Sequence, residues 1–231
     1  MIKKITKPYL IAEIGGNHEG DIKYAKKLID LAAKSGVDCI KLQIYSEKSL
    51  VNKNLDSERY NHFKKFSLKT EDYLYLAKYI KSKNLDFSAS IWNPTLINIF
   101  KKYVSFFKIG SGDLTAFDII DKILKTNKKI ILSTGISSLK QISNTVNFIK
   151  KYKFYNIKKK LILLHCTSLY PNNFKNVNLL AINNLKKKYG LEIGYSDHCI
   201  GIEAILLSAI NNVKFIEFHF TDNKKRKFRD H

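Results

Sequence analysis

The chain has 231 residues and a mass of 26.7 kDa, which suits one large domain or two small ones. Apolar residues make up 45% and charged residues 26%, with 3 prolines and 10 glycines, so low-complexity and collagen-like chains are excluded. No apolar run is long enough for a bilayer span or a secretory signal. We therefore predict a soluble, cytoplasmic protein with no membrane partner.

The formal net charge of +21 suggests nucleic-acid binding, but only three of the 41 basic residues are arginine (Arg59, Arg226, Arg229). A protein that reads bases depends more on arginine, whose planar guanidinium matches guanine bidentately. We therefore predict no specific nucleic-acid partner. A positive field still attracts an anionic substrate such as a phosphate ester.

Cys39, Cys166 and Cys199 are odd in number and widely spaced. This pattern disfavours a disulfide framework and a zinc site made of cysteines alone.

Short apolar segments, each followed by a helical pattern, recur along the chain. The first helical pattern begins at Asp21, with Ile22, Ala25, Ile29 and Ala32 on one face, and Gly36 suits its termination. The segment 46–68 is too long for an ordinary loop, so it is either a functional loop or contains a short helix. The predicted strands are 9–14, 38–43, 86–91, 106–109, 129–133, 161–165, 192–195 and 214–220.

The later helices carry their own start signals. Thr70 is a suitable N-cap, and capping boxes are predicted for Thr115 with Asp118 and for Ser138 with Gln141. Further helices are predicted around 179–188 and 202–210.

Eight strands alternating with helices in this length predict an α/β fold, a (β/α)8 TIM barrel in a single domain over residues 1–231. A doubly wound open sheet is the alternative, but it normally has fewer strands, and no Gly-x-Gly-x-x-Gly follows the first strand. No helical pattern follows the eighth strand, so the barrel is expected to lack its final helix.

In such a barrel the active site lies at the C-terminal ends of the strands, where polar side chains should converge. Lysines inside two strands need a compensating anion, because desolvating an ammonium group is costly. This pattern predicts a site for an anion and a divalent metal. The strand-end residues are Glu13, Lys41, Gln43, Ser88, Ser90, Lys108, Ser111, Asp113, Ser133, Thr134, His165, Thr167, Ser168, Ser196, Asp197, His198, Glu217 and His219.

Two of these residues suggest the metal. His198 and His219 end consecutive predicted strands, and neutral imidazoles suit Mn, Fe, Co or Zn. The alternative is that each is a hydrogen-bonded core residue. Ser133-Thr134-Gly135 is likewise either a plain turn or a phosphate site made of backbone N–H groups.

A set of motifs in this order resembles the N-acetylneuraminate (sialic acid) synthase family, which includes the legionaminic and pseudaminic acid synthases. The motifs are IAEIGGNH (11–18), KLQ (41–43), FKIGSGD (107–113), LSTG (132–135), LHCT (164–167) with YP (170–171), YSDH (195–198) and EFHFT (217–221). Members of this family are (β/α)8 barrels followed by a small antifreeze-like domain. The resemblance therefore implies that the present chain ends before that domain.

The resemblance implies condensation of phosphoenolpyruvate with an N-acetylated hexosamine such as N-acetylmannosamine. The products are a sialic acid-type nonulosonic acid and phosphate. It implies a divalent metal held by His198 and His219, most simply Mn²⁺, with Mg²⁺ or Co²⁺ as alternatives, and it leaves a homodimer open. The residues that match phosphoenolpyruvate-binding positions are Lys41, Ser90, Lys108, Ser111, Ser133, Ser168 and Ser196.

Glu13, Asp113 and Asp230 match carboxylates that contact the sugar or the attacking water, and Glu13 is the first choice as base. The chain departs from the family in two places. Ser168 replaces an Asn found in some members, and residues 227–230 read Lys-Phe-Arg-Asp where Pro-Gly-Pro-Asp is common. The alternative function is a truncated, inactive barrel that retains only anion binding or nonspecific nucleic-acid binding.

Overall fold

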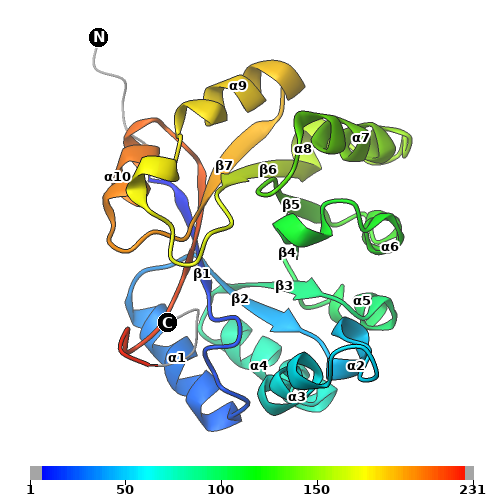
Figure 1. Cartoon of the computed structure of the whole chain (residues 1–231), viewed down its shortest axis with the longest axis vertical. Helices are drawn as coiled ribbons and strands as arrows, with labels where there is room; N and C mark the ends of the chain where they lie inside the picture. Colours follow the sequence, from blue (N-terminus) through cyan, green and yellow to red (C-terminus); the bar gives the residue numbers. More distant parts are fainter. Residues whose placement is uncertain (1–6, 227–231) are drawn as a thin grey trace. The chain divides into compact units, whose positions relative to one another are not determined.

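The computed structural model describes residues 7–226, and Figure 1 labels its elements. Eight strands follow one another in the order β1-β2-β3-β4-β5-β6-β7-β8 of a closed barrel, which confirms the predicted (β/α)8 class and excludes the open-sheet alternative. The strands are β1 (Tyr9–Glu13), β2 (Cys39–Ile44), β3 (Asp86–Ile91), β4 (Phe106–Ile109), β5 (Lys129–Ser133), β6 (Leu161–Cys166), β7 (Glu192–Asp197) and β8 (Phe215–His219).

An α-helix follows each of the first seven strands, and after β3, β4 and β6 a short 3₁₀ helix precedes it. The α-helices are α1 (Ile22–Lys34), α2 (Glu47–Leu50), α3 (Ser57–Phe66), α4 (Thr70–Ser82), α5 (Ile97–Phe100), α6 (Phe117–Lys125), α7 (Leu139–Lys150), α8 (Ile157–Lys160), α9 (Leu180–Tyr189) and α10 (Glu203–Ile210). The 3₁₀ helices are η1 (Pro94–Leu96), η2 (Ser111–Asp113) and η3 (Phe174–Asn176). In the part of the chain that is described, none of these helices has the length and apolar character that a membrane span requires.

Contacts within the described chain fall into two compact units. The N-terminal unit contains Ala12–Phe107 and residues 219–226, and the C-terminal unit contains Lys108–Phe218 and residues 7–11. The assignment of residues 1–231 to one domain stays a prediction.

In the N-terminal unit, β2 pairs in parallel with β3 from Cys39 opposite Asp86 to Ile44 opposite Ile91. Helices α1 and α4 lie side by side (Figure 1). The Asp21 carboxylate caps α1 by accepting the N–H groups of Lys23 and Tyr24, at 2.7 and 3.3 Å. Of the predicted apolar face of α1, Ala25, Ile29 and Ala32 are buried, as is Leu28, and Ile22 is half-buried.

Two details of the helix predictions in this unit are settled by the structure. The segment 46–68 contains α2 and α3, so the helical alternative is confirmed. Thr70 is the first residue of α4 and not its cap. Lys69 occupies the cap position, and its backbone N–H donates to the Asp72 carboxylate at 3.3 Å. The acidic residue in the first turn of α4 therefore satisfies a backbone donor at the start of this helix.

The C-terminal unit contains the parallel pairs β5–β6, β6–β7 and β7–β8. The capping box of α7 is confirmed, because Ser138 N–H donates to Gln141 Oε1 and Gln141 N–H donates to Ser138 Oγ. The capping box predicted for Thr115 is wrong. The 3₁₀ turn η2 moves the helix start along the chain, so Ala116 occupies the cap position of α6 without a side-chain bond.

Residues 220–226 follow β8 without forming a helix. They lie against the start of the N-terminal unit, where Asn17 Nδ2 donates to the Phe220 carbonyl at 2.9 Å. Tyr24 donates its hydroxyl proton to Asp222, and Arg226 pairs with Glu19 at 2.8 Å.

Candidate active site

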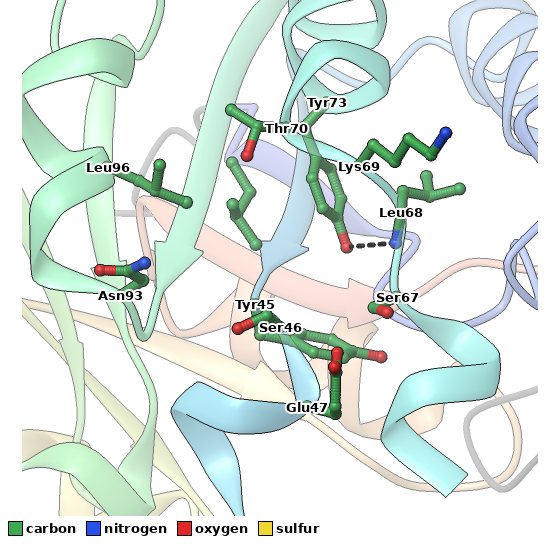
Figure 2. A pocket seen from close by; sticks show the side chains of 11 residues that line it. Tyr45, Ser46, Glu47, Ser67, Leu68, Lys69, Thr70, Tyr73, Asn93 and Leu96 are labelled. Carbon is green, nitrogen blue, oxygen red and sulfur yellow. Dashed lines mark hydrogen bonds between the residues drawn. The ribbon is translucent and has the colours of Figure 1, made fainter. Parts of the chain in front are cut away.

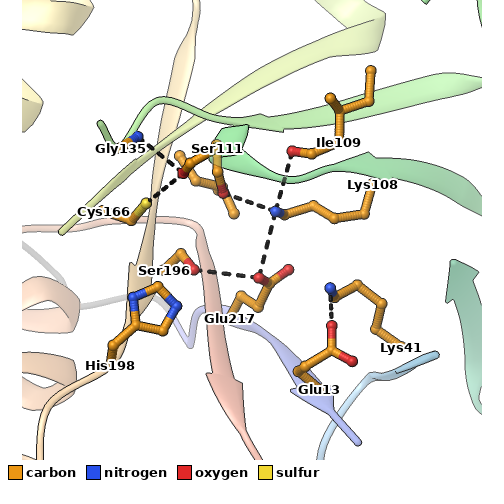
Figure 3. Close-up of polar contacts among 12 residues, drawn as sticks. Glu13, Lys41, Lys108, Ile109, Ser111, Gly135, Cys166, Ser196, His198 and Glu217 are labelled. Carbon is orange, nitrogen blue, oxygen red and sulfur yellow. Dashed lines mark hydrogen bonds and ion pairs between the residues drawn. The ribbon is translucent and has the colours of Figure 1, made fainter. Parts of the chain in front are cut away.

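A buried lysine connects strand ends in the C-terminal unit (Figure 3). Lys108, on β4, donates from Nζ to Ser133 Oγ at 2.8 Å and to the Ile109 carbonyl at 3.3 Å. Its Nζ also lies 3.5 Å from Glu217 Oε1, which accepts the Ser196 hydroxyl at 3.2 Å. Lys108, Ser133, Ser196 and Glu217 are each at most 6% exposed, so this network lies almost entirely out of water.

Glu217 has a larger part in this network than the sequence indicated. It was recognised as a strand-end residue, but no role was predicted for it. The structure shows it as the counter-charge of Lys108. The available signal in the sequence was its place in the predicted strand 214–220, and the structure sets it opposite Ser196 of β7.

The predicted serines beyond β4 and β6 surround the backbone at Gly135. Ser111 Oγ accepts the Gly135 N–H at 3.0 Å and lies 3.0 Å from Cys166 Sγ, which is 3.9 Å from Ser168 Oγ. A Cβ at residue 135 would lie 2.4 Å from Ser168 Oγ and 2.7 Å from Cys166 Sγ. Glycine is therefore required for these polar groups to approach the backbone so closely.

His198 directly follows β7, and its imidazole ring contacts Thr167 and Tyr170. Its Nδ1 lies 2.8 Å from the Thr167 carbonyl, and the Tyr170 ring centroid lies 4.1 Å from its own. A carbonyl can only accept, so Nδ1 carries the proton and Nε2 has the lone pair. Burial is the main cause that lowers the pKa of His198, which favours the neutral ring. A neutral imidazole whose Nδ1 proton is held by a carbonyl fits a metal ligand through Nε2.

In the N-terminal unit a second buried lysine has a carboxylate partner. Lys41 on β2 forms an ion pair with Glu13 on β1, and the two residues are 4% and 1% exposed (Figure 3). Ser90 on β3 is also buried and lies opposite Gln43 of β2 in the strand register. The predicted Glu13, Lys41 and Ser90 thus belong to neighbouring strand ends of this unit.

The remaining candidates have other positions. Asp113 is half-buried on η2, His219 is half-buried at the end of β8, and Asp230 lies outside the described residues. Several strand-end residues have ordinary structural bonds to carbonyls, namely Ser88 to Phe106, Thr134 to Leu164, Thr167 to Asn176 and His165 with Val177. Within residues 7–226, no group of three or more His, Cys, Asp or Glu side chains is arranged to hold a metal.

A pocket that the sequence did not predict lies in the N-terminal unit, with a volume of about 390 Å³ (Figure 2). Tyr45 and Ser46 after β2, Asn93 after β3, and the start of α4 line it. The Leu68 N–H donates to the Tyr73 hydroxyl at 3.5 Å at its wall. Its lining mixes hydroxyl groups with aromatic rings.

Comparison with known proteins decides the family. The profile of the NeuB family matches residues 28–231. The chain belongs to the NeuB family. The predicted resemblance to the sialic acid synthase family is thereby confirmed. The NeuB-family match covers all the strand ends described above except that of β1.

The relatives of this NeuB-family chain include synthases of several nonulosonic acids. An uncharacterized protein of Methanocaldococcus jannaschii is 38% identical over 96% of this chain. The N,N'-diacetyllegionaminic acid synthase of Campylobacter jejuni is 34% identical over 98% of it. The chain spans 65% of the first relative's length and 71% of the second's.

Among solved structures, the N-acetylneuraminic acid (sialic acid) synthetase of Leptospira borgpetersenii, in complex with citrate, superposes with a TM-score of 0.86. It is 35% identical, and the match covers 94% of this chain and 74% of that one. A spore coat polysaccharide biosynthesis protein of Bacillus subtilis superposes with a TM-score of 0.84 at 26% identity, over 99% of this chain and 63% of that one.

Proposed function

We propose that this chain catalyses the condensation of phosphoenolpyruvate with an N-acetylated hexosamine, which yields a nonulosonic acid and phosphate. The observation that carries the proposal is the buried network of Lys108 with Ser133 and Glu217. A buried ammonium with hydroxyl groups around it is suited to an incoming anion. The family and the named activities of the relatives support the same reaction class.

Lysines and serines at the strand ends are proposed to bind the anion. In the C-terminal unit, Lys108, Ser111, Ser133, Ser168 and Ser196 supply one ammonium and four hydroxyl groups. In the N-terminal unit, Lys41 and Ser90 supply the others.

The carboxylates are proposed to act on the water and the sugar. Glu13 is the candidate base, because it is buried and its partner Lys41 can neutralise it until substrate enters. Phosphate would leave as the two lysines offset its charge. Asp113 and Asp230 remain candidates for contacts with the sugar.

His198 and His219 are proposed as ligands of a divalent cation, with Mn²⁺ preferred over Mg²⁺ and Co²⁺. The support is the Nε2 lone pair of His198, whose Nδ1 proton is held by the Thr167 carbonyl. A bound ion would supply Lewis-acid polarisation of the sugar aldehyde. The homodimer, the cytoplasmic location and the absence of a specific nucleic-acid partner stay predictions.

Phosphate release tests the function. Phosphoenolpyruvate is incubated with the chain and a panel of N-acetylated hexosamines and their phosphates, with Mn²⁺ present or chelated. We expect phosphate only with an acceptor sugar and metal, and loss of release in Lys108→Met. Lys214→Met, which removes an exposed lysine of the same unit, should retain release. No phosphate with any sugar would favour the alternative of an inactive anion-binding barrel.

A further inference from the structure

A second buried polar group lies on the opposite face of β7 from Ser196. Side chains alternate along a strand, so Tyr195 and Asp197 share the face that Ser196 does not use. The Tyr195 hydroxyl donates to Asp197 Oδ1 at 2.6 Å. The two residues are 1% and 4% exposed, so both polar groups are out of water. This pair does not belong to the Lys108 network.

Burying a carboxylate is costly unless hydrogen bonds compensate it. An apolar residue would be the simpler choice for that side of a strand, so the retained charge calls for an explanation. Asp197 Oδ1 accepts a second hydrogen bond, from the Cys199 N–H at 3.2 Å. This bond from a side chain to the N–H two residues later closes an Asx turn, and the residue enclosed by the turn is His198.

The other side of the turn is fixed by Asn172. Its N–H donates to the His198 carbonyl at 2.7 Å, and its Nδ2 donates to Cys199 Sγ at 3.6 Å. Asn172 and Cys199 also form an isolated parallel bridge. The backbone of His198 is therefore held by a hydrogen bond on its own carbonyl and by the Asp197 turn around it.

We propose that Asp197 and Tyr195 are positioning residues for His198. They fix its backbone, so that the Nδ1 bond to Thr167 directs Nε2 to a divalent cation. This inference rests on the metal site of the proposed function. Tyr195 orients the Asp197 carboxylate, and Asp197 holds the turn. A misplaced ligand weakens metal binding even though the imidazole itself is unchanged.

Manganese affinity without substrates tests this inference, measured on the whole chain by electron paramagnetic resonance of free Mn²⁺. We expect Tyr195→Phe and Asp197→Ala each to weaken Mn²⁺ binding by about 10-fold or more. Asp197→Asn keeps an oxygen acceptor and should recover most of the affinity. The spectrum of the Co²⁺-loaded chain should change in the weakened variants, because ligand geometry changes.

Tyr155→Phe is the matched control. Tyr155 is also buried in the C-terminal unit, and its hydroxyl proton is within reach of the Lys128 and Lys160 carbonyls, at 3.0 and 2.9 Å. It should lower stability and leave Mn²⁺ affinity unchanged. Because Asp197→Ala could fail to fold, Tyr195→Phe, which removes one oxygen atom, is the deciding variant.

Equal Mn²⁺ affinity in Tyr195→Phe and the parent chain would overturn the inference, as would a parent chain that binds no Mn²⁺. If Tyr195→Phe loses Mn²⁺ affinity, Tyr155→Phe keeps it, and the parent chain releases no phosphate, the positioning role stands. That outcome would contradict only the proposed synthase reaction.

Discussion

Lys108 Nζ lies 3.5 Å from Glu217 Oε1, and both side chains are more than nine-tenths buried. The ammonium also donates to Ser133, so its charge is compensated before any substrate enters. A phosphate that bound here would share the ammonium with Glu217. The effect of this pair on stability and its proposed part in anion binding can be measured separately.

Removing one partner of this pair should destabilise the fold, since the other charge stays buried and uncompensated. We expect Lys108→Met to lower the free energy of unfolding by about 3 kcal/mol. Glu217→Gln should cost a similar amount, and the double variant should cost clearly less than the sum. Urea denaturation of the four proteins gives the coupling free energy.

The matched control is Lys214→Met. Lys214 pairs with Glu192 at 3.3 Å, but its side chain is 63% exposed, so its loss should cost no more than about 1 kcal/mol. Strictly additive effects of the Lys108 and Glu217 substitutions would contradict a buried ion pair.

Gly135 gives a second prediction, about affinity. Gly135→Ala places a methyl group among Ser111, Cys166 and Ser168, whose side chains must then move. We expect the KM for phosphoenolpyruvate to rise at least about 10-fold, the equivalent of one or two lost hydrogen bonds. Gly112→Ala, with nothing within 4 Å of the added carbon, should leave the KM unchanged. Equal KM values in both variants would remove this backbone from the anion site.

The strands and most helices could be predicted from the sequence because their buried apolar residues recur at the regular spacing of a strand or a helix. For β3, β4 and β5 the predicted and observed limits agree at both ends. The apolar spacing of α1 and the Ser138–Gln141 box are local signals, and both are confirmed. Thr115 failed as a cap because the preceding 3₁₀ turn depends on contacts beyond the local sequence.

The candidate site was predicted only in part. Position at a strand end identified both lysines and both of their carboxylate partners, but not which residues pair, because pairing depends on side-chain direction across strands. Asp197 shows the same limit. It stands between two predicted site residues, yet alternation turns its side chain to the other face of β7. The pocket beyond β2 brings together segments that no short motif connects.

His18 gives a third prediction, about pH. The residue is fully buried, and this burial lowers its pKa to about 4. Below pH 6.5 the unfolded chain binds a proton that the folded chain refuses, so stability falls as pH falls from 6.5 to 4. The free energy of unfolding should decrease by up to about 3 kcal/mol over that range from this residue alone.

His18→Gln lacks the titrating group and keeps an oxygen that can accept the Gly20 N–H. Its unfolding free energy, measured in urea at several pH values, should therefore decline less steeply than that of the parent chain. Parallel curves would show that the pKa of His18 is the same in the folded and the unfolded chain, which would contradict the prediction.

The last prediction separates a phosphoenolpyruvate site from a general anion site. A ligand that binds only the folded state stabilises it, by about 2.7 kcal/mol at 100 times its Kd, which raises the Tm by several degrees. We expect that shift with phosphoenolpyruvate and a clearly smaller one with equal sulfate, with Mn²⁺ in both. Sulfate lacks the carboxylate and enol groups that the proposed serines would bind.

Lys41→Ala should lose most of the shift. It should also melt below the parent chain without ligand, because Glu13 is then buried with no ammonium beside it. Glu13→Gln/Lys41→Met removes both charges, so it should melt higher than Lys41→Ala and still lack the shift. If sulfate and phosphoenolpyruvate stabilise the parent chain equally, the strand ends form a general anion site, and the synthase proposal fails for this chain. The other outcome is that only phosphoenolpyruvate raises the Tm of the parent chain, and that the double variant shows no such rise. Lys41 then contributes to substrate recognition independently of its contribution to stability.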